Sequence, residues 1–391
     1  MRAGTGYHHL PLRVLVAGGG VAALETCLAL RALAGDRVHV TLLAPNRYLV
    51  HRPVGVCDPL AIHGRVRVPL ARLAHEAGAD LRHDRVTSIE PAARRVHTAA
   101  GYELPYDVLV VAIGARPGPP PAGAEVLHED NTAGCRVLMH RLYEGHVPSL
   151  AFIEPPAPTD VLDLYELAVH AAVTLRQRHV VADLTFATAE PAPLAVLGPR
   201  ASGVLRATLA GHGLRIVESA YVRSIGGGEV QLAPPARRIL AEHVVAAPRL
   251  VGPRPDHLPC DRDGFLRVDP TGRVPGVPGV FAAGNCTAFP VKHPSLAAQQ
   301  AHAVAASIAA DTGQPLPEDP FKPVLRCMLP TRLRWYVEAP LTGGQGDATR
   351  ISTSPLWSPQ LRFDAPFLAP FLEHEERHDA LELSEPAPSA A

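Results

Sequence analysis

The sequence lacks an excess of charge of either sign, because 37 lysines and arginines are balanced by 38 aspartates and glutamates. Such a chain has no basic surface typical of nucleic-acid binding, so we expect no nucleic-acid partner. It also lacks an apolar run near the roughly 18 residues that a membrane-spanning helix needs. A core strand beginning near residue 14 leaves no room for a secretory signal. We therefore expect a cytoplasmic protein, either free or on the inner face of the membrane.

Closely spaced cysteines are absent as well. Six cysteines lie far apart between residues 27 and 327, with no C-x-x-C pair and no metal-ligand spacing. This distribution is typical of free thiols in a reducing compartment. The chain has 391 residues, of which 47% are hydrophobic, and this length is too great for one ordinary core. We expect two or three globular domains.

What the sequence does contain is a glycine motif close to its start. Residues 13–25 read RVLVAGGGVAALE, in which the apolar run 14–17 predicts a parallel strand covered on both faces. Gly18, Gly20 and Ala23 occupy the three small positions of a G-x-G-x-x-G/A fingerprint. The first allows a tight turn, the second lets the backbone approach a pyrophosphate, and the third lets helix and strand pack closely. The motif predicts a dinucleotide site.

The residues after the glycines support the same prediction with one departure. A helix is predicted over 21–33, and its first residues, Val21 and Ala22, would present N–H groups to the phosphates. A second apolar strand follows at 38–43. An acid that holds the ribose hydroxyls usually stands about 20 residues beyond the glycines. This chain has Asn46 there, which can still form a hydrogen bond.

A second strand–turn–helix unit begins near residue 149. The strand is predicted over 150–153 and the helix over 161–178, and between them residues 154–160 read EPPAPTD where a glycine cradle would stand. Prolines have no N–H to donate, and their rings block the close approach that glycine allows. The repetition predicts an α/β fold with two Rossmann-like dinucleotide-binding domains, of which the second is a poor site for NAD(P)H.

The predicted domains follow from this repetition. Strand 244–247 is taken as the return of the chain to the first domain, and a proline-rich stretch near residue 315 as a boundary. The limits are 1–147 for the first part of the first dinucleotide-binding domain, 148–243 for the degenerate second domain, 244–314 for the rest of the first domain, 315–373 for a C-terminal region and 374–391 for a disordered tail.

Three segments together resemble a known family. They are AGGGVAALE near the start, VLVVAIGARP before residue 118 and GVFAAGNCTAFPVKHPSLAAQQA near residue 290. They resemble the flavoproteins with two dinucleotide-binding domains, the pyridine nucleotide-disulfide oxidoreductase fold, over most of residues 12–325. The branch is similar to type II NADH dehydrogenase and sulfide:quinone oxidoreductase. The resemblance implies an FAD-dependent oxidoreductase with a small-molecule electron donor and acceptor, the acceptor in this branch being a quinone.

The resemblance also implies which residues bind FAD. In the family the late motif reads Gly-Asp, whereas this chain has Gly284 and Asn285, so the hydrogen bond is kept and the charge is lost. The predicted cofactor-binding set is Gly18, Gly20, Val21, Ala22, Ala23, Asn46, Arg52, Pro53, Ala112, Gly114, Gly284, Asn285 and Gln299.

Three further residues are predicted to act in catalysis. A helix starting near residue 294 would aim its N-terminus at the flavin ring, with Lys292 beside it. Gln299 resembles the glutamine that borders the quinone side, and Glu166 corresponds to the acid that follows the second motif. The alternatives are a solvated lysine and polar faces of two helices. His51 and His293 flank the same segments, and we expect them to titrate near neutral pH.

The sequence leaves the electron donor open. Sulfide:quinone oxidoreductases carry a cysteine near the second motif, but the loop 154–160 has none, and Cys327 matches the later cysteine only loosely. One thiol without a partner cannot cycle through a disulfide. A second hypothesis is a non-catalytic descendant that binds flavin or regulates, suggested by Asn46, Asn285 and the proline loop.

Two C-terminal features point to other functions. Residues 374–378 read HEERH, which matches a zinc-protease motif, but they lie in a polar segment without a third ligand, and we expect no metal. Residues 355–372 concentrate Trp357 and three phenylalanines. This segment is predicted to contact a membrane surface, to cover the flavin as a lid, or to form a homodimer contact.

Overall fold

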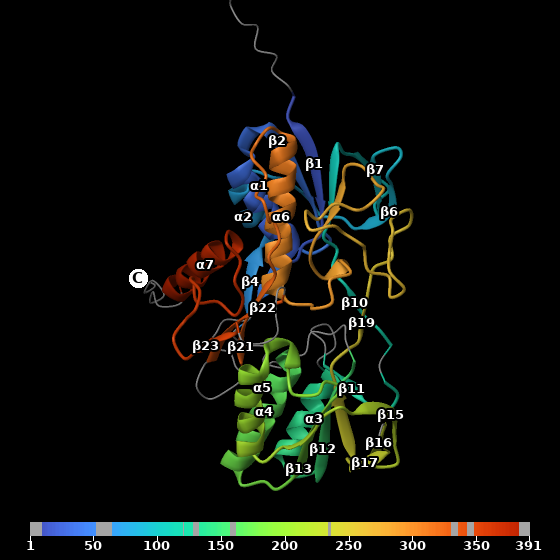
Figure 1. The fold of residues 1–391 in the computed structure, drawn as a ribbon, viewed down its shortest axis with the longest axis vertical. Coiled ribbons are helices and arrows are strands. Elements are labelled where there is room, and N and C mark those ends of the chain that lie inside the picture. The colour runs from blue at the N-terminus through green and yellow to red at the C-terminus, as the bar shows by residue number, and fades with distance from the viewer. Residues whose placement is uncertain are drawn as a thin grey trace, which may run out of the picture.

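The computed structural model describes residues 10–51, 65–119, 121–127, 133–156, 162–233, 236–329, 335–341 and 348–382, with the side chains of the last helix given to residue 376. The chain forms two α/β lobes, one above the other, with a smaller C-terminal part lying against both (Figure 1). This mixed α/β architecture with parallel sheets confirms the predicted fold class.

The first lobe is built on a five-stranded parallel sheet in the order β20-β9-β1-β2-β5. Helices α1 and α6 lie side by side over it (Figure 1). The structure places α1 and β2 at the residues that the sequence predicts, because apolar spacing and the glycine turn are local signals. The bounds are β1 Leu12–Ala17, α1 Val21–Leu33, β2 Val38–Leu43, β5 Asp80–Arg82, β9 Val108–Val111, β20 Val280–Ala282 and α6 Pro294–Asp311.

The second lobe has its own five-stranded parallel sheet in the order β11-β18-β12-β13-β14. Strand β18 pairs with β12 here, so the assignment of strand 244–247 to the first domain is wrong. The sequence of an all-apolar strand does not indicate which of two parallel sheets the strand joins, because both bury it on both faces. The bounds are β11 Glu125–Val126, α3 Ala133–Tyr143, β12 Ser149–Glu154, α4 Leu162–Arg178, β13 Asp183–Thr188, α5 Pro199–Gly211, β14 Arg215–Val217 and β18 His243–Ala246. The other domain limits stay predictions.

Smaller antiparallel units decorate both lobes. Helix α2 begins at residue 70, because the residues just before it form strand β4, which pairs with β3. The bounds are β3 Tyr48–His51, β4 Val66–Pro69, α2 Leu70–Glu76, β6 Val86–Glu90, β7 Arg95–Thr98, β8 Glu103–Pro105, β15 Tyr221–Gly226, β16 Glu229–Ala233 and β17 Arg237–Leu240, with short 3-10 turns at Gly35–Arg37, Ala195–Leu197 and Gly284–Cys286.

The two chain crossings between the lobes are joined to each other. Strand β10 (Arg116–Pro117) pairs antiparallel with β19 (Leu250–Val251) at the waist of the molecule (Figure 1). Next to this pair, the backbone N–H of Gly118 donates to the carbonyl of Arg249 at 2.7 Å. A Cβ at Gly118 would lie 2.9 Å from that oxygen, so glycine permits the close approach. The crossings therefore form one two-stranded connection.

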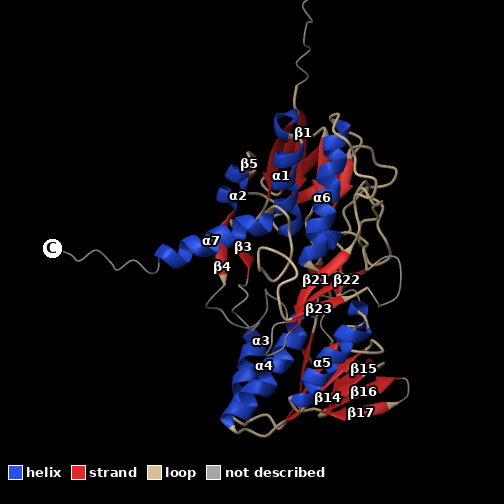
Figure 2. Ribbon diagram, turned by 60° about the vertical axis from the view of Figure 1, so that its left-hand side comes forward, coloured by secondary structure: helices blue, strands red, loops and turns tan. Residues whose placement is uncertain are grey.

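The C-terminal region consists of a three-stranded antiparallel sheet and a helix. The strands are β21 (Val324–Leu329), β22 (Trp335–Pro340) and β23 (Arg350–Ser352), which lie between α6 and α5 in Figure 2. Helix α7 spans Leu368–Glu382 and packs against the first lobe. The predicted disorder from residue 374 is therefore wrong as far as residue 382, because buried Glu375 is ion-paired with Arg72 at 2.6 Å. Residues 383–391 lie outside the described part.

The aromatic segment before α7 is buried inside the protein. Trp357 and Phe363 are each only 8% exposed, and Phe363 belongs to the core of the first lobe. The indole Nε1 of Trp357 donates to the carbonyl of Leu361 at 3.1 Å. These two side chains pack within the chain itself, and the three predicted roles of the segment stay predictions. Within the described ranges, no helix is both long enough and apolar enough to cross a membrane.

The start of α7 depends on one buried carboxylate in α1. Glu25 is fully buried and accepts hydrogen bonds from the backbone N–H groups of Phe367 at 3.1 Å and Leu368 at 2.7 Å. We expect Glu25→Ala to lower the free energy of unfolding by about 2–4 kcal/mol, because it leaves both N–H groups unpaired. It should also speed limited proteolysis within residues 353–382. Glu25→Gln keeps an acceptor and the volume and is the control; equal proteolysis of all three proteins would contradict this role.

Candidate active site

A cavity of about 610 Å³ lies between the two lobes and the C-terminal region. Its walls come from the turn after β1, the segment after β9, the start of α4 and the start of α6, which are distant in sequence. The predicted residues on its wall are Gly20, Val21, Ala22, Asn46, Ala112, Gly114, Glu166, Gly284 and Asn285. Gly18, Ala23, Lys292 and Gln299 are not part of the described wall, and Arg52 and Pro53 lie outside the described residues.

The glycines after β1 have two different physical tasks. Gly18 has a φ of +139°, and a Cβ there would lie 2.1 Å from the carbonyl oxygen of Ala112, so the turn fits against β9 only with glycine. Gly20 has an ordinary φ of −97°, and a Cβ there would meet no atom within 4 Å. Glycine at residue 20 is therefore not required by the backbone, and its lack of a side chain leaves space in the cavity. This open cradle at the start of α1 fits a pyrophosphate.

The late motif meets the first motif at the cavity. Gly284 has a φ of +81°, and a Cβ there would lie 2.7 Å from the Cβ of Ala22. The backbone N–H of Gly284 donates to Oε1 of Gln300 at 2.7 Å, which fixes the turn. Asn285 then lies on the wall. Segments more than 250 residues apart thus form one continuous surface around the site.

Glu166 reaches the cavity from the second lobe. It lies on α4 and forms an ion pair with Arg362 of the C-terminal region, and both side chains line the cavity. The two side chains are 8% and 19% exposed. The pair therefore joins two parts of the chain at the site. No sequence pattern points to Arg362, because its partner is 196 residues away.

Two predicted catalytic residues point elsewhere. Nζ of Lys292 donates to the carbonyl of Thr287 at 2.5 Å and lies 3.9 Å from the ring centroid of Phe265, and burial lowers the lysine pKa to about 8. The amide of Gln299 binds both backbone groups of Val324, at 2.8 and 2.9 Å, and so holds β21 against α6. Direct roles for these residues stay predictions. Adjacent helical positions face different directions, which is why Gln300 and not Gln299 contacts the glycine turn.

Two histidines on the wall, His51 and His293, are expected from the sequence to titrate near neutral pH, and this prediction is wrong, because burial lowers the pKa of each. His51 is buried, which lowers its pKa to about 4, and its Nδ1 lies 3.5 Å from Oε1 of Glu376 on α7. His293 caps the N-terminus of α6. Sequence reasoning missed several other wall residues, because their segments carry no motif: Tyr48, Arg65, Met328 and Phe363.

A buried acid stands at the start of the second motif. Glu154 ends β12, is 5% exposed and accepts a hydrogen bond from the hydroxyl of Tyr165 at 2.7 Å. The Tyr165 ring stacks on Phe186 with centroids 4.1 Å apart. Burial raises the pKa of Glu154 to about 7, and the nearby Glu190 adds to the rise. A buried acid thus stands where a glycine cradle would offer N–H donors. Residues 157–161 of this loop are not described.

The buried acid gives a pH-dependent prediction. The pKa of Glu154 rises from 4.5 to about 7 on folding, so its charge costs stability above pH 4.5 and reaches its full cost above pH 7. Glu154→Gln keeps an acceptor for Tyr165 and removes the charge. We expect a gain of about 2–3 kcal/mol in unfolding free energy at pH 8 and none at pH 4.5. Denaturation at both pH values checks this. The control is Glu242→Gln at a half-exposed position, and a gain independent of pH would refute the interpretation.

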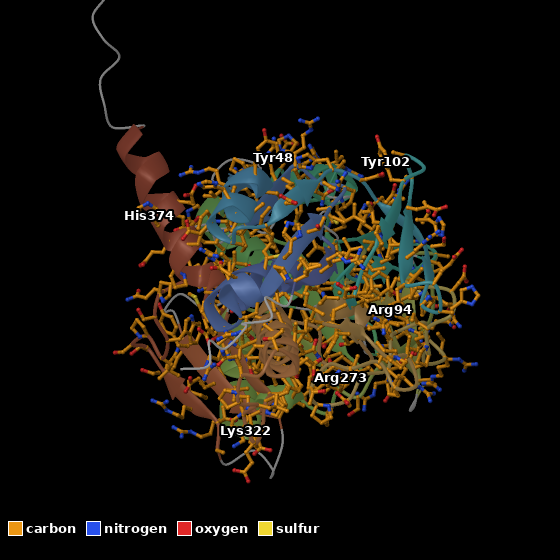
Figure 3. All side chains as sticks on the ribbon, turned by 90° about the horizontal axis from the view of Figure 1, so that it is seen from above. Tyr48, Arg94, Tyr102, Arg273, Lys322 and His374 are labelled. Carbon is orange, nitrogen blue, oxygen red and sulfur yellow. The ribbon has the colours of Figure 1, made fainter. Side chains whose placement is uncertain are left out.

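Only the first histidine of the HEERH segment, His374, has a described side chain, because that of His378 lies outside the described residues. His374 lies on the outward side of α7, at the edge of the molecule in Figure 3. Its neighbour Glu375 is buried and ion-paired with Arg72. In the ranges that the structure describes, no group of three or more histidine, cysteine or acidic side chains is placed to hold a metal ion.

Comparison with known proteins agrees with this geometry. The model of the pyridine nucleotide-disulphide oxidoreductase family matches residues 12–143 and 166–307. A sulfide-quinone reductase of Aquifex aeolicus is 29% identical over 199 residues, which are 46% of this chain and 43% of that protein. An NADH dehydrogenase-like protein of Mycobacterium tuberculosis is 28% identical over 296 residues, 71% of this chain and 73% of that protein. The alignment to the Aquifex protein thus spans less than half of its length.

Solved structures show the same fold. The sulfide:quinone oxidoreductase of Aquifex aeolicus superposes with a TM-score of 0.75 at 19% identity, over 95% of this chain and 90% of that chain. A ferredoxin reductase of Rhodopseudomonas palustris gives 0.62 at 20% identity, over 83% and 82%. Both the predicted family and the predicted cofactor are confirmed. The chain belongs to the pyridine nucleotide-disulphide oxidoreductase family, whose members are FAD-binding flavoproteins.

Proposed function

We propose that this protein is an FAD-dependent oxidoreductase that takes electrons from a donor other than NAD(P)H and passes them to a quinone. One observation carries the proposal: the cradle at Gly20 opens onto a large cavity, whereas buried Glu154 and the prolines close the second nucleotide site. A pyrophosphate brought to a buried carboxylate would be repelled and would find no N–H donors on the prolines.

The cavity residues suggest how FAD would be held. The N–H groups at the start of α1 and the space beside Gly20 suit its pyrophosphate. Asn46 is exposed near the end of β2, within reach of a ribose, and Asn285 offers an amide to the cofactor from the late motif. When bound, FAD would supply the redox chemistry, accepting electrons from the donor and releasing them to the acceptor.

The wall also supports a quinone acceptor. Leu127, Leu162, Met328 and Phe363 give it an apolar part beside the ion pair of Glu166 and Arg362. A relative is named a sulfide-quinone reductase, but sulfide is not favoured as the donor here. The loop 154–160 has no cysteine, and Cys327 is fully buried. Contact with a membrane surface and a homodimer stay predictions.

The visible absorption spectrum of the purified protein tests the proposal. We expect bound flavin, no bleaching on anaerobic addition of NADH or NADPH, and reoxidation of chemically reduced flavin by a water-soluble quinone. A colourless protein that takes up no FAD would refute the proposal. Rapid bleaching of the flavin by NADH would show that NADH is a donor and would refute its exclusion. Bound flavin that no quinone reoxidises would instead favour the non-catalytic descendant that Asn46 and Asn285 suggest.

A further inference from the structure

We propose that the Nε2–H group of His293 is the hydrogen-bond donor that the protein directs at the flavin ring from the start of α6. The inference rests on the proposed function, because it assumes that the cavity holds FAD. It assigns to His293 the place that the sequence suggested for Lys292, whose ammonium group is turned toward Thr287 and Phe265.

The hydrogen bonds around His293 determine where its ring proton lies. The backbone N–H of Ser295 donates to Nδ1 at 3.2 Å, and the Ser295 hydroxyl lies 2.8 Å from the same nitrogen. That hydroxyl oxygen accepts the backbone N–H of Arg326 at 3.3 Å, which leaves its own hydrogen for Nδ1. Because Nδ1 accepts from Ser295, it carries no proton, and the neutral ring is protonated at Nε2.

The ring is also held in the neutral form. His293 is 6% exposed, and burial lowers its pKa to about 4. The ring lines the cavity, and no residue in the described part of the chain forms a hydrogen bond with Nε2. The side chain therefore presents one N–H donor of fixed position to whatever occupies the cavity.

The backbone at the start of α6 offers no donor in its place. Pro294 has no N–H, and the N–H of Ser295 is used by the Nδ1 cap. The N–H groups of Leu296 and Ala297 both donate to the carbonyl of His293, at 3.1 and 3.0 Å. At the first four positions of the helix, residues 294–297, the backbone N–H group is therefore either absent or already hydrogen-bonded. A hydrogen bond from this helix end to a ligand must therefore come from the His293 ring.

Such a donor would act on the redox balance of the cofactor. The flavin ring gains negative charge when it is reduced, and an N–H donor at a helix N-terminus stabilises charge there. Reduced FAD is therefore bound more tightly, relative to oxidised FAD, than it would be without this donor. His293 raises the reduction potential, and its role as N-cap of α6 is separable from this effect.

Two variants separate the donor from the cap. His293→Ser keeps an N-cap acceptor and removes the ring donor, whereas His293→Gln keeps an N–H donor and is a poor cap. His302→Ala is the matched control, since His302 lies on α6 and stacks on Phe367 away from the cavity wall. The midpoint potential of bound FAD is measured against a reference dye, with the melting temperature of each protein as a measure of folding.

We expect His293→Ser to weaken the binding of reduced relative to oxidised FAD roughly tenfold, which is about 30 mV for a two-electron couple. His293→Gln should recover at least half of this shift despite a lower melting temperature, and His302→Ala should change the ratio less than twofold. A His293→Ser potential equal to that of the wild type, or a His293→Gln potential as low as that of His293→Ser, overturns the inference. A wild-type protein that binds no FAD overturns the proposed function itself, and the inference with it.

Discussion

Gly20→Val is expected to abolish FAD binding while the protein stays folded. A Cβ at residue 20 meets no protein atom within 4 Å, and its φ of −97° suits any residue, so the fold tolerates the side chain. The same side chain fills the cradle at the start of α1 and separates the phosphates from the N–H groups. We expect affinity for FAD to fall roughly 100-fold or more, equivalent to about 3 kcal/mol. Titration of the apoprotein with FAD, followed by flavin fluorescence, measures this.

Gly18→Ala, two residues earlier in the same turn, is the control. A Cβ there would lie 2.1 Å from the carbonyl oxygen of Ala112 at a φ of +139°. This variant should therefore lose stability by roughly 1–3 kcal/mol or more through backbone strain and overpacking. The two substitutions should thus have different effects: Gly20→Val impairs FAD binding, and Gly18→Ala impairs folding. Normal FAD affinity in folded Gly20→Val would refute the hypothesis that the pyrophosphate binds beside Gly20, and the binding site of the cofactor would then be unassigned.

Arg362→Met is expected to destabilise the protein by about 3–5 kcal/mol, because it removes the cation that is ion-paired with the buried carboxylate of Glu166. Glu166 is 8% exposed in its side chain and is ion-paired with Arg362 across the cavity. The pair joins α4 of the second lobe to the C-terminal region, so its loss should also loosen their contact. Chemical denaturation at neutral pH measures the free energy of unfolding.

The double variant Glu166→Gln/Arg362→Met distinguishes a buried charge from lost packing. It removes both charges and keeps most of the volume, so we expect it to recover most of the stability lost in Arg362→Met. A double variant as unstable as Arg362→Met would show that the arginine acts through packing alone. Exposed pairs such as Arg95 with Glu103, both about half exposed, should give less than about 1 kcal/mol in the same cycle.

Comparison of sequence and structure separates two kinds of information. The turn after β1 could be predicted because strand, glycines and helix are consecutive, and the structure places α1 at the predicted residues. The proline loop after β12 could be read from the sequence for the same reason, since prolines act on their own backbone, but its effect on NAD(P)H binding stays a prediction. Family membership followed from three such local segments in a fixed order.

The features that the sequence did not reveal are contacts between distant segments. Strand β18 joins the second sheet by pairing with β12, although its apolar residues suit either sheet. Glu25 caps α7 from more than 340 residues away, which turns a polar segment expected to be disordered into a helix.

The sequence by itself determined the family, the α/β architecture and the first nucleotide cradle of this protein, because each is specified by the order of neighbouring residues. Only the tertiary structure decided which side chains face the cavity. It turns Lys292 and Gln299 toward backbone carbonyls and brings Arg362 to Glu166. It also leaves His293 as the donor at the start of α6. The physical reason is that the direction of a side chain depends on the partners that packing brings to it.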